Sequence, residues 1–317
     1  ILTLKIKKTL KIIIPLLFGG GLVWYSLSSI SITILAAYFE NANYWWIGLG
    51  LFFGILSHLS RAYRWKFMLE PIGYTPKLTN SILAVLVGYL VNLAIPRAGE
   101  VSRAAVLTNY EDVPFEKGFG TIVAERIADL IMMLFIVLIT LFVQFDFIYN
   151  LLTSNFNTTN SILILAGIII SFYLITRNIK KATKGIALKI KKFITGLIEG
   201  VTSIFKMKKK WAFLFHTFFI WTMYVAMFWA TIPSIENLEV PFGGVLIGFI
   251  AGGFSIAATN GGIGLYPIAV AGALALFGIA EEPATAFGWI MWTTQTAMII
   301  LFGGLSFLLL PICNKAK

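Results

Sequence analysis

The sequence predicts an all-α polytopic membrane protein with about six full spans and two broken or re-entrant hairpins, eight apolar segments in all, arranged as an inverted repeat. The first observation is composition: 58% of the 317 residues are hydrophobic and 12% are charged. A soluble domain of this length carries roughly a quarter charged residues. The other two observations are long apolar runs and loops that contain no lysine or arginine.

The apolar runs come close to or exceed the roughly 20 residues that a helix needs to cross a bilayer. The predicted full spans are 12–30, 44–60, 119–144, 160–176, 211–232 and 285–310. Two further apolar regions, 80–107 and 243–279, are each interrupted in the middle by Gly, Pro and polar residues. These interruptions predict two hairpins.

The basic residues predict the orientation. None of the 25 Lys and Arg residues lies in 31–43, 145–159, 233–242 or 280–284. By the positive-inside rule these segments lie outside, and both termini are cytoplasmic in a plasma (inner) membrane. Each broken region must then return to its starting side. The arms of the first hairpin, about 22 and 14 Å long, are too short to cross a core of about 30 Å, whereas the second, with arms of about 24 Å, is either re-entrant or just spanning.

Two domains follow from this count. Residues 1–144 form the first repeat, with two spans, the hairpin 80–107 and one span. Residues 145–317 form the second, with two spans that flank the basic segment 178–207, the hairpin 243–279 and one span. Inverted repeats with paired interrupted segments are typical of carriers whose site lies between the halves. The segment 178–207 fits an interfacial amphipathic helix, or a basic loop that only fixes topology.

Charged residues gather at the first hairpin and at the start of span 119–144. Gly99 permits a close bend, and Glu100 and Arg103 can pair across one helical turn. Charges at membrane depth usually face a partner or a watery cavity. The cluster is therefore either a structural ion-pair network or a site where an arginine holds a phosphate. The candidate residues are Arg97, Gly99, Glu100, Arg103, Glu125, Arg126 and Asp129.

The turn of the second hairpin has three glycines in four residues. Backbone amides exposed there, at the start of a helix, favour an anionic headgroup. Glycines of this kind also serve helix packing in membranes. The candidate residues are Asn260, Gly261, Gly262, Gly264 and Tyr266.

These motifs carry a family resemblance. The chain resembles, over nearly its whole length, the transmembrane flippase-like domain of the lysylphosphatidylglycerol synthase family. The resemblance rests on the Pro-Arg-Ala-Gly-Glu-x-x-Arg turn that begins at Pro96, the Glu125-Arg126-x-x-Asp129 span and the Gly-Gly-Ile-Gly turn from Gly261. It implies lipid flipping by a stand-alone member that lacks the aminoacyl-transferase domain. Many members carry a glutamate shortly after the glycines, where this chain has Tyr266 and Pro267, which implies a different headgroup preference.

The expected function is a carrier for an anionic or zwitterionic phospholipid, or for a lipid-linked phosphate, with the headgroup between the two hairpins. Arg97 and Arg103 would bind phosphate, and Glu100 and Asp129 would orient them or meet a cationic headgroup. The alternatives are a non-transporting component of a lipid or glycan synthesis complex and an intramembrane lipid-modifying enzyme. We expect no enzyme activity, catalytic residue, cofactor or metal, because the sequence shows no nucleophile motif and has one cysteine and two distant histidines. The net charge of +11 lies in membrane-flanking loops and predicts no nucleic-acid partner, and a homo-oligomer stays open.

Overall fold

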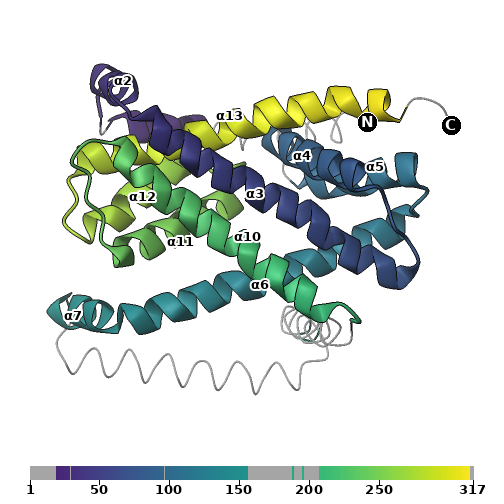
Figure 1. The fold of residues 1–317 in the computed structure, drawn as a ribbon. Helices are drawn as coiled ribbons and strands as arrows, with labels where there is room; N and C mark the ends of the chain where they lie inside the picture. Colours follow the sequence, from purple (N-terminus) through teal and green to yellow (C-terminus); the bar gives the residue numbers. More distant parts are fainter. Residues whose placement is uncertain are drawn as a thin grey trace. The chain divides into compact units, whose positions relative to one another are not determined.

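The computed structural model describes residues 19–28, 30–95, 97–155 and 207–314, together with Leu188 and Thr195. All regular secondary structure in this part of the chain is helical, which confirms the all-α prediction (Figure 1). The predicted span 160–176, most of the amphipathic segment 178–207 and the beginning of span 12–30 lie outside the described residues.

The chain divides into two compact units, one of Ile1–Glu125 with Trp211–Lys317 and the other of Arg126–Lys210. The first unit begins with a helix over Gly19–Ser28 and holds most of the other elements. They are α2 (Ile32–Glu40), α3 (Tyr44–Leu69), η1 (Glu70–Ile72), α4 (Leu78–Ala94), α5 (Ala98–Glu111), α10 (Lys210–Thr231), η2 (Ile232–Ser234), α11 (Phe242–Ala258), α12 (Leu265–Ala275) and α13 (Glu281–Cys313). Helix α6 (Phe115–Val143) starts in the first unit and ends in the second, which also holds α7 (Phe145–Asn155). The inverted-repeat boundary near residue 144 stays a prediction.

Three helices of the described part are long and apolar enough to cross a membrane: α6, α10 with η2, and α13. A fourth span results if Gly19–Ser28 and Ile32–Glu40, bent by 84°, are one broken span. Helix α3 has 26 residues, or about 39 Å. Three basic residues in the C-terminal half of α3 lower its hydropathy, so this helix is not one of the three candidate spans. A multi-pass membrane protein is confirmed, and the number of six full spans stays a prediction.

Both broken regions form a helix, a break and a second helix. In the first, α4 packs on α5 across a break where Arg97 has a left-handed backbone (φ 63°). A β-carbon on Gly99 would overlap the carbonyl oxygen of Gly88, so a side chain there would push the two helices apart. In the second, α11 and α12 flank a turn with positive φ at Gly261, Gly262 and Gly264. The longest of these arms has 17 residues, or about 25 Å, which is less than the hydrocarbon core.

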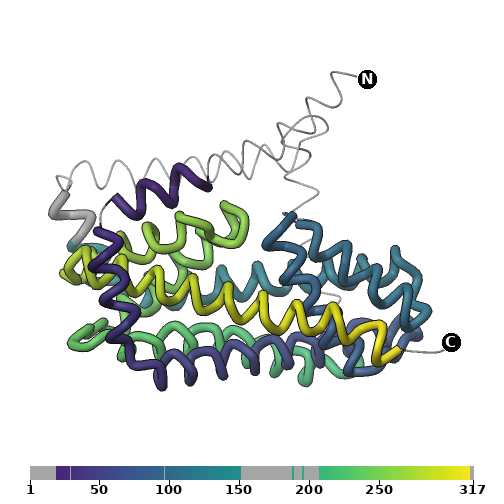
Figure 2. The backbone as a smooth tube through the Cα atoms, turned by 90° about the horizontal axis from the view of Figure 1, so that it is seen from above, coloured from purple at the N-terminus to yellow at the C-terminus, as the bar shows by residue number. Residues whose placement is uncertain are grey.

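Helix α13 packs against both hairpins, on α12 and on α4 (Figure 2). The turns of the hairpins also touch, because Asn260 Nδ2 donates to the Leu93 carbonyl oxygen at 2.7 Å. Trp292 Nε1 of α13 donates to the Gly261 carbonyl oxygen at 2.8 Å. The two interrupted segments are therefore in contact within the first unit.

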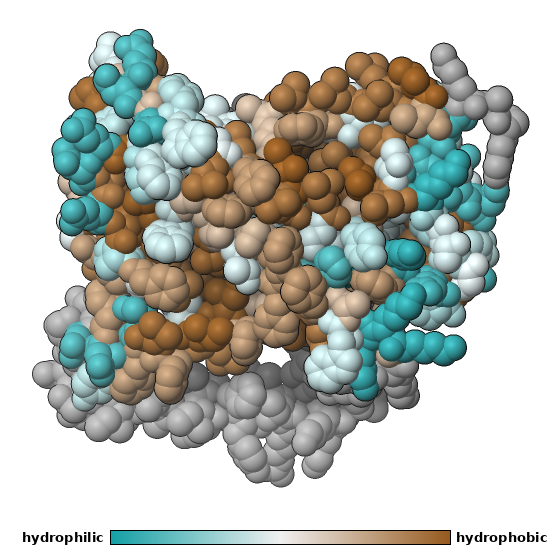
Figure 3. Space-filling model, viewed as in Figure 1, coloured by the Kyte–Doolittle hydropathy of each residue, from teal (hydrophilic) through white to brown (hydrophobic). Residues whose placement is uncertain are grey.

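Apolar side chains form both the interior and much of the surface. One buried cluster surrounds Phe228 and Phe287, and a second surrounds Trp65 and Leu107. The face in Figure 3 is covered largely by hydrophobic residues. Large exposed side chains on α10 include Trp211, Phe215, Phe218 and Trp229. Such a surface is typical of a helix bundle that faces lipid.

Candidate functional site

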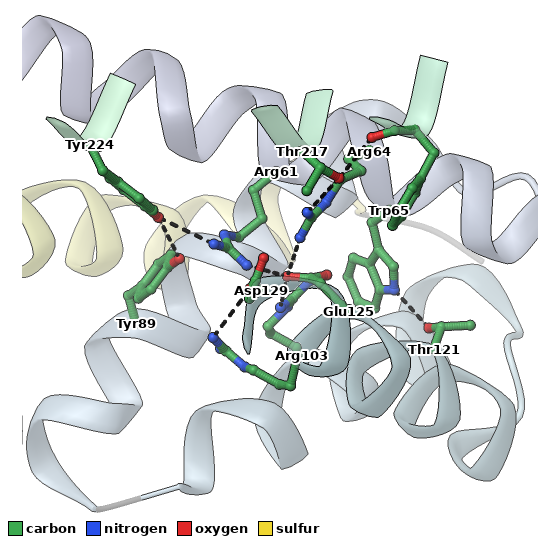
Figure 4. Close-up of polar contacts among 12 residues, drawn as sticks. Arg61, Arg64, Trp65, Tyr89, Arg103, Thr121, Glu125, Asp129, Thr217 and Tyr224 are labelled. Atoms are coloured by element: carbon green, nitrogen blue, oxygen red, sulfur yellow. Dashed lines mark hydrogen bonds and ion pairs between the residues drawn. The ribbon is translucent and has the colours of Figure 1, made fainter. Parts of the chain in front are cut away.

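The polar centre of the first unit is Glu125 of α6, which is fully buried and binds three arginines (Figure 4). Its Oε1 lies 2.6 Å from Arg61 Nη1 and 3.5 Å from Arg64 Nη2. Arg103 binds both carboxylate oxygens, with Nη2 at 3.0 Å from Oε2 and Nη1 at 3.2 Å from Oε1. All four side chains are at most 3% exposed. We call these four residues the arginine cluster.

Three helices supply the cluster. Arg61 and Arg64 are three residues apart on α3 and therefore project from the same face. Arg103 comes from α5, one helical turn after Gly99, whose close contact with Gly88 fixes the position of that helix. The C-terminal arm of the first hairpin thus carries Arg103 to Glu125.

Neighbouring side chains fix the direction of each guanidinium. Arg64 Nη1 donates to Thr217 Oγ1 of α10 at 2.9 Å. The Arg103 guanidinium lies 4.4 Å from the centre of the Trp65 ring, and the indole of Trp65 donates to Thr121 Oγ1 at 2.8 Å. A guanidinium over an aromatic face gains roughly 2 kcal/mol when it is desolvated. The arginines are preorganised rather than loosely placed.

The cluster has the chemistry of an anion site. Three guanidinium groups carry about 15 N–H donors, whereas a carboxylate accepts about four hydrogen bonds. Arg103 Nε is buried and has no hydrogen-bond partner among the residues that the structure describes. Phosphate oxygens match the planar donor fork of arginine as well as a carboxylate does. The cluster can therefore hold a phosphate group beside, or in exchange with, Glu125.

The structure brings together some of the predicted residues of the first hairpin. Arg103 and Glu125 meet in the cluster, so the partner of Arg103 is Glu125 and not Glu100, which the spacing had offered. Glu100 lies part-buried on α5, and Arg97 is exposed at the break. Arg126 and Asp129, both in the second unit, form an ion pair of 3.8 Å along α6.

The predicted residues of the second turn have packing contacts of their own. A β-carbon at Gly264 would lie 2.5 Å from the backbone nitrogen of Val23, so this glycine lets two backbones approach. A β-carbon at Gly262 would lie 3.1 Å from Tyr266 Cβ, which is a tight contact, and the positive φ of this residue also disfavours a side chain. Tyr266 is buried, and its hydroxyl lies 3.5 Å from Gln295 Nε2. Asn260 hydrogen-bonds to α4, and Gly261 accepts a hydrogen bond from α13.

Arg61 and Arg64 are the members of the arginine cluster that the sequence did not single out. They follow an apolar run, where basic residues ordinarily mark the cytoplasmic end of a span. The signal that distinguishes them is their spacing of three on a helix that continues to Leu69. Their burial, at 2% and 0% exposure, shows that they belong to the interior.

A comparison with known protein families covers most of the chain. The family model of the lysylphosphatidylglycerol synthase TM region matches residues 12–303, which include both hairpins and the whole arginine cluster. The chain belongs to this family. Its membership confirms the resemblance carried by the two turns and by the α6 motif, and it makes the chain a membrane domain of lipid-related function.

One curated relative is the UPF0104 membrane protein MJ1595 of Methanocaldococcus jannaschii, which is 31% identical to this member of the family over 135 residues. The match covers 42% of the chain and 39% of that protein, so it spans well under half of the relative's length. No solved structure matches the chain.

Proposed function

We propose that this protein is a flippase-like carrier that moves a phospholipid or a lipid-linked phosphate across the plasma membrane, with both termini cytoplasmic. The observation that carries the proposal is the arginine cluster, buried in an apolar helical bundle of a lipid-related family. Buried charges in membrane proteins are costly and usually serve a substrate or ion. The partner is a membrane lipid whose acyl chains stay in the bilayer.

Glu125 acts in this proposal as a resident counter-ion. When no headgroup is bound, its carboxylate neutralises guanidinium groups that would otherwise be strongly destabilising. A phosphate that enters takes over part of the donor set, because its two non-bridging oxygens accept from the planar arginine fork as the carboxylate oxygens do. Exchange between two anions lets the site release the headgroup again, which a carrier requires.

The hairpin turns supply the moving part. The Asn260–Leu93 and Trp292–Gly261 hydrogen bonds hold the second turn against the first hairpin and α13. Interrupted segments of this kind rock or part around a fixed site in carriers with inverted repeats. Loss and recovery of these two bonds would alternate access to the arginine cluster.

A second candidate is a non-transporting component of a lipid or glycan synthesis complex. The observation in its favour is that all three arginines contact Glu125, as a purely structural network would. An intramembrane enzyme is the third candidate, and it would change the lipid chemically.

Reconstitution separates these candidates. Purified protein is placed in proteoliposomes that contain a trace of a phospholipid with a fluorescent acyl chain. A membrane-impermeant reductant then quenches the fluorescent lipid in the outer leaflet. A carrier makes almost all fluorescence accessible, whereas a scaffold leaves about half protected, as in protein-free vesicles. Mass spectrometry of the recovered lipid tests for an enzyme. Protection at the protein-free level contradicts the proposal.

A further inference from the structure

The helix over Gly19–Ser28 has one face buried in the first unit and an opposite face that is exposed. Gly19 and Ser26 are buried, and a spacing of seven residues puts them on the same side of a helix. Trp24 and Tyr25 are 74% and 60% exposed. Large rings on the outside of a membrane bundle are turned to the lipid or its interface. This helix therefore lies between the bilayer and the residues that it covers.

The buried face of this helix lies on the turn of the second hairpin. A β-carbon at Gly264 would lie 2.5 Å from the backbone nitrogen of Val23. The positive φ of Gly264, 69°, also disfavours any other residue there. A β-carbon at Gly19 would lie 3.0 Å from Ile263 Cγ2. The helix and the turn are therefore in close contact at two neighbouring residues of the turn.

A hydrogen bond and a bend complete the arrangement. Trp289 Nε1 of α13 donates to Ser26 Oγ at 3.1 Å, and both side chains are buried. The helix meets α2 at a bend of 84°. Ile30, at the bend, belongs to a buried apolar cluster, and the Tyr38 hydroxyl of α2 donates to Glu282 Oε1 of α13 at 3.2 Å. Helix α2 is thus anchored, and the bend can serve as a hinge for the helix that precedes it.

Three elements hold the second turn. Asn260 is bonded to α4 and Gly261 to α13, and the Gly19–Ser28 helix covers Ile263 and Gly264. Closely packed groups do not move past each other unless both rearrange. The turn can therefore leave α4, as the proposed function requires, only if the Gly19–Ser28 helix moves as well.

Resting on the proposed carrier function, we infer that the Gly19–Ser28 helix is the gate of the carrier. When it lies on the second turn it holds the two hairpins together, and its release about the 84° bend limits the rate of lipid movement. A hydrogen bond between side chains and a glycine contact suit this role, because they can break and form again while α2 stays anchored. Gly264 then serves a contact within the protein, although its position in the turn predicted a headgroup.

A reversible disulfide tests the gate. Gly19→Cys and Ile263→Cys are combined in a Cys313→Ser background, and because Ile263 Cγ2 is one bond from Cβ, the two thiols come within disulfide reach. Disulfide formation is followed by the loss of free thiols, and lipid flux in proteoliposomes is measured after oxidation and again after reduction. Oxidation should lower the flux by about tenfold or more, because a locked gate removes the open state, and reduction should restore the wild-type rate. The matched control replaces Gly19→Cys by Gly20→Cys, at an exposed glycine whose β-carbon would meet nothing within 4 Å, and its flux should not respond to oxidation.

Ser26→Ala tests the same contact without a cysteine. It removes the hydrogen bond from Trp289 and should raise the initial flux about threefold, the typical effect of one interhelical hydrogen bond in a membrane. Ser28→Ala, at an exposed serine whose hydroxyl donates to the Tyr25 carbonyl oxygen, should keep the wild-type rate. Ser26→Ala decides the matter where the reduced cysteine pair does not reach wild-type flux.

Wild-type flux in protein whose disulfide has formed overturns the gate and leaves the carrier proposal standing. Failure of the cysteines at positions 19 and 263 to crosslink overturns it too, because the helix would then not lie on the turn. A flux in Ser26→Ala at or below the wild-type rate has the same meaning. If the wild type itself moves no lipid, the carrier proposal fails, and the gate fails with it.

Discussion

Glu125 holds three arginines that come from two helices, α3 and α5. Each buried ion loses several kcal/mol of hydration, which its partners must offset with well-aligned hydrogen bonds. Arginine suits this role because its guanidinium is weakly hydrated and can stack on a ring, as Arg103 does on Trp65. The same properties make these side chains available to a phosphate.

Substitutions of Arg103 separate its charge from its planar geometry. Arg103→Gln removes two charge-assisted bonds to a buried carboxylate and is expected to lower the free energy of unfolding by about 3 kcal/mol. Arg103→Lys keeps the charge and should cost about 1 kcal/mol. Unfolding in detergent is measured, with Lys77→Gln at an exposed lysine as the neutral control. If Arg103→Gln had the same free energy of unfolding as the wild type, the pair with Glu125 would not be formed in the folded protein.

The sequence identified part of the site and missed the rest for a physical reason. Arg103 stands out because it follows the break of the first hairpin. Glu125 stands out because it is a charged residue inside an apolar span. Arg61 and Arg64 look like the basic end of a span, and only tertiary packing on α6 and α10 makes them buried. The partner of Arg103 also depends on packing. Helical spacing alone predicts a pair with Glu100, and only the tertiary structure brings Arg103 to Glu125.

The two hairpins and α13 pack together and form a supporting frame. Their existence follows from Gly and Pro in apolar runs, which the sequence displays directly. Their mutual contact does not, since Asn260 and Leu93 are 167 residues apart. Close approach along α13 depends on glycines such as Gly288, which faces the Pro267 backbone, and Gly303, which faces α4.

Neighbouring glycines of α13 provide a matched pair. A β-carbon at Gly303 would lie 2.7 Å from Leu90 Cβ and 2.9 Å from the Leu86 carbonyl oxygen, whereas Gly304 has nothing within 4 Å. Gly303→Ala is expected to lower stability by about 1 to 3 kcal/mol through overpacking. Gly304→Ala should be neutral or slightly stabilising, because alanine favours helix. Thermal unfolding in detergent compares them, and equal melting temperatures would contradict the packing of α13 on α4.

The distribution of charge along the whole chain predicts the membrane topology, which the fold alone does not determine. The helical class and the membrane family are confirmed. The sidedness remains a prediction, because a bundle of helices does not record which way it was inserted. The inverted repeat remains a prediction as well. The positive-inside rule supplies that information through loops.

Single cysteines test the predicted sidedness. In a background where the exposed Cys313 is replaced by serine, cysteines at the exposed positions Glu236 and Asn109 are treated with an impermeant thiol reagent. Glu236→Cys should react from outside, and Asn109→Cys only after the membrane is opened. Reaction of Asn109→Cys in sealed cells would rule out a first hairpin that returns to the cytoplasmic side.

If the arginine cluster carries a phosphate headgroup, lipid flux through folded variants depends on the planar fork of Arg103. Flux in proteoliposomes is measured for the wild type, Arg103→Lys and Lys77→Gln, with the melting temperature of each. We expect Arg103→Lys to stay folded and to lose about tenfold in flux, because lysine lacks the bidentate fork that grips phosphate. Lys77→Gln should match the wild type. Wild-type flux in folded Arg103→Lys, and again in Arg103→Gln where it still folds, would show that the cluster only holds the helices together.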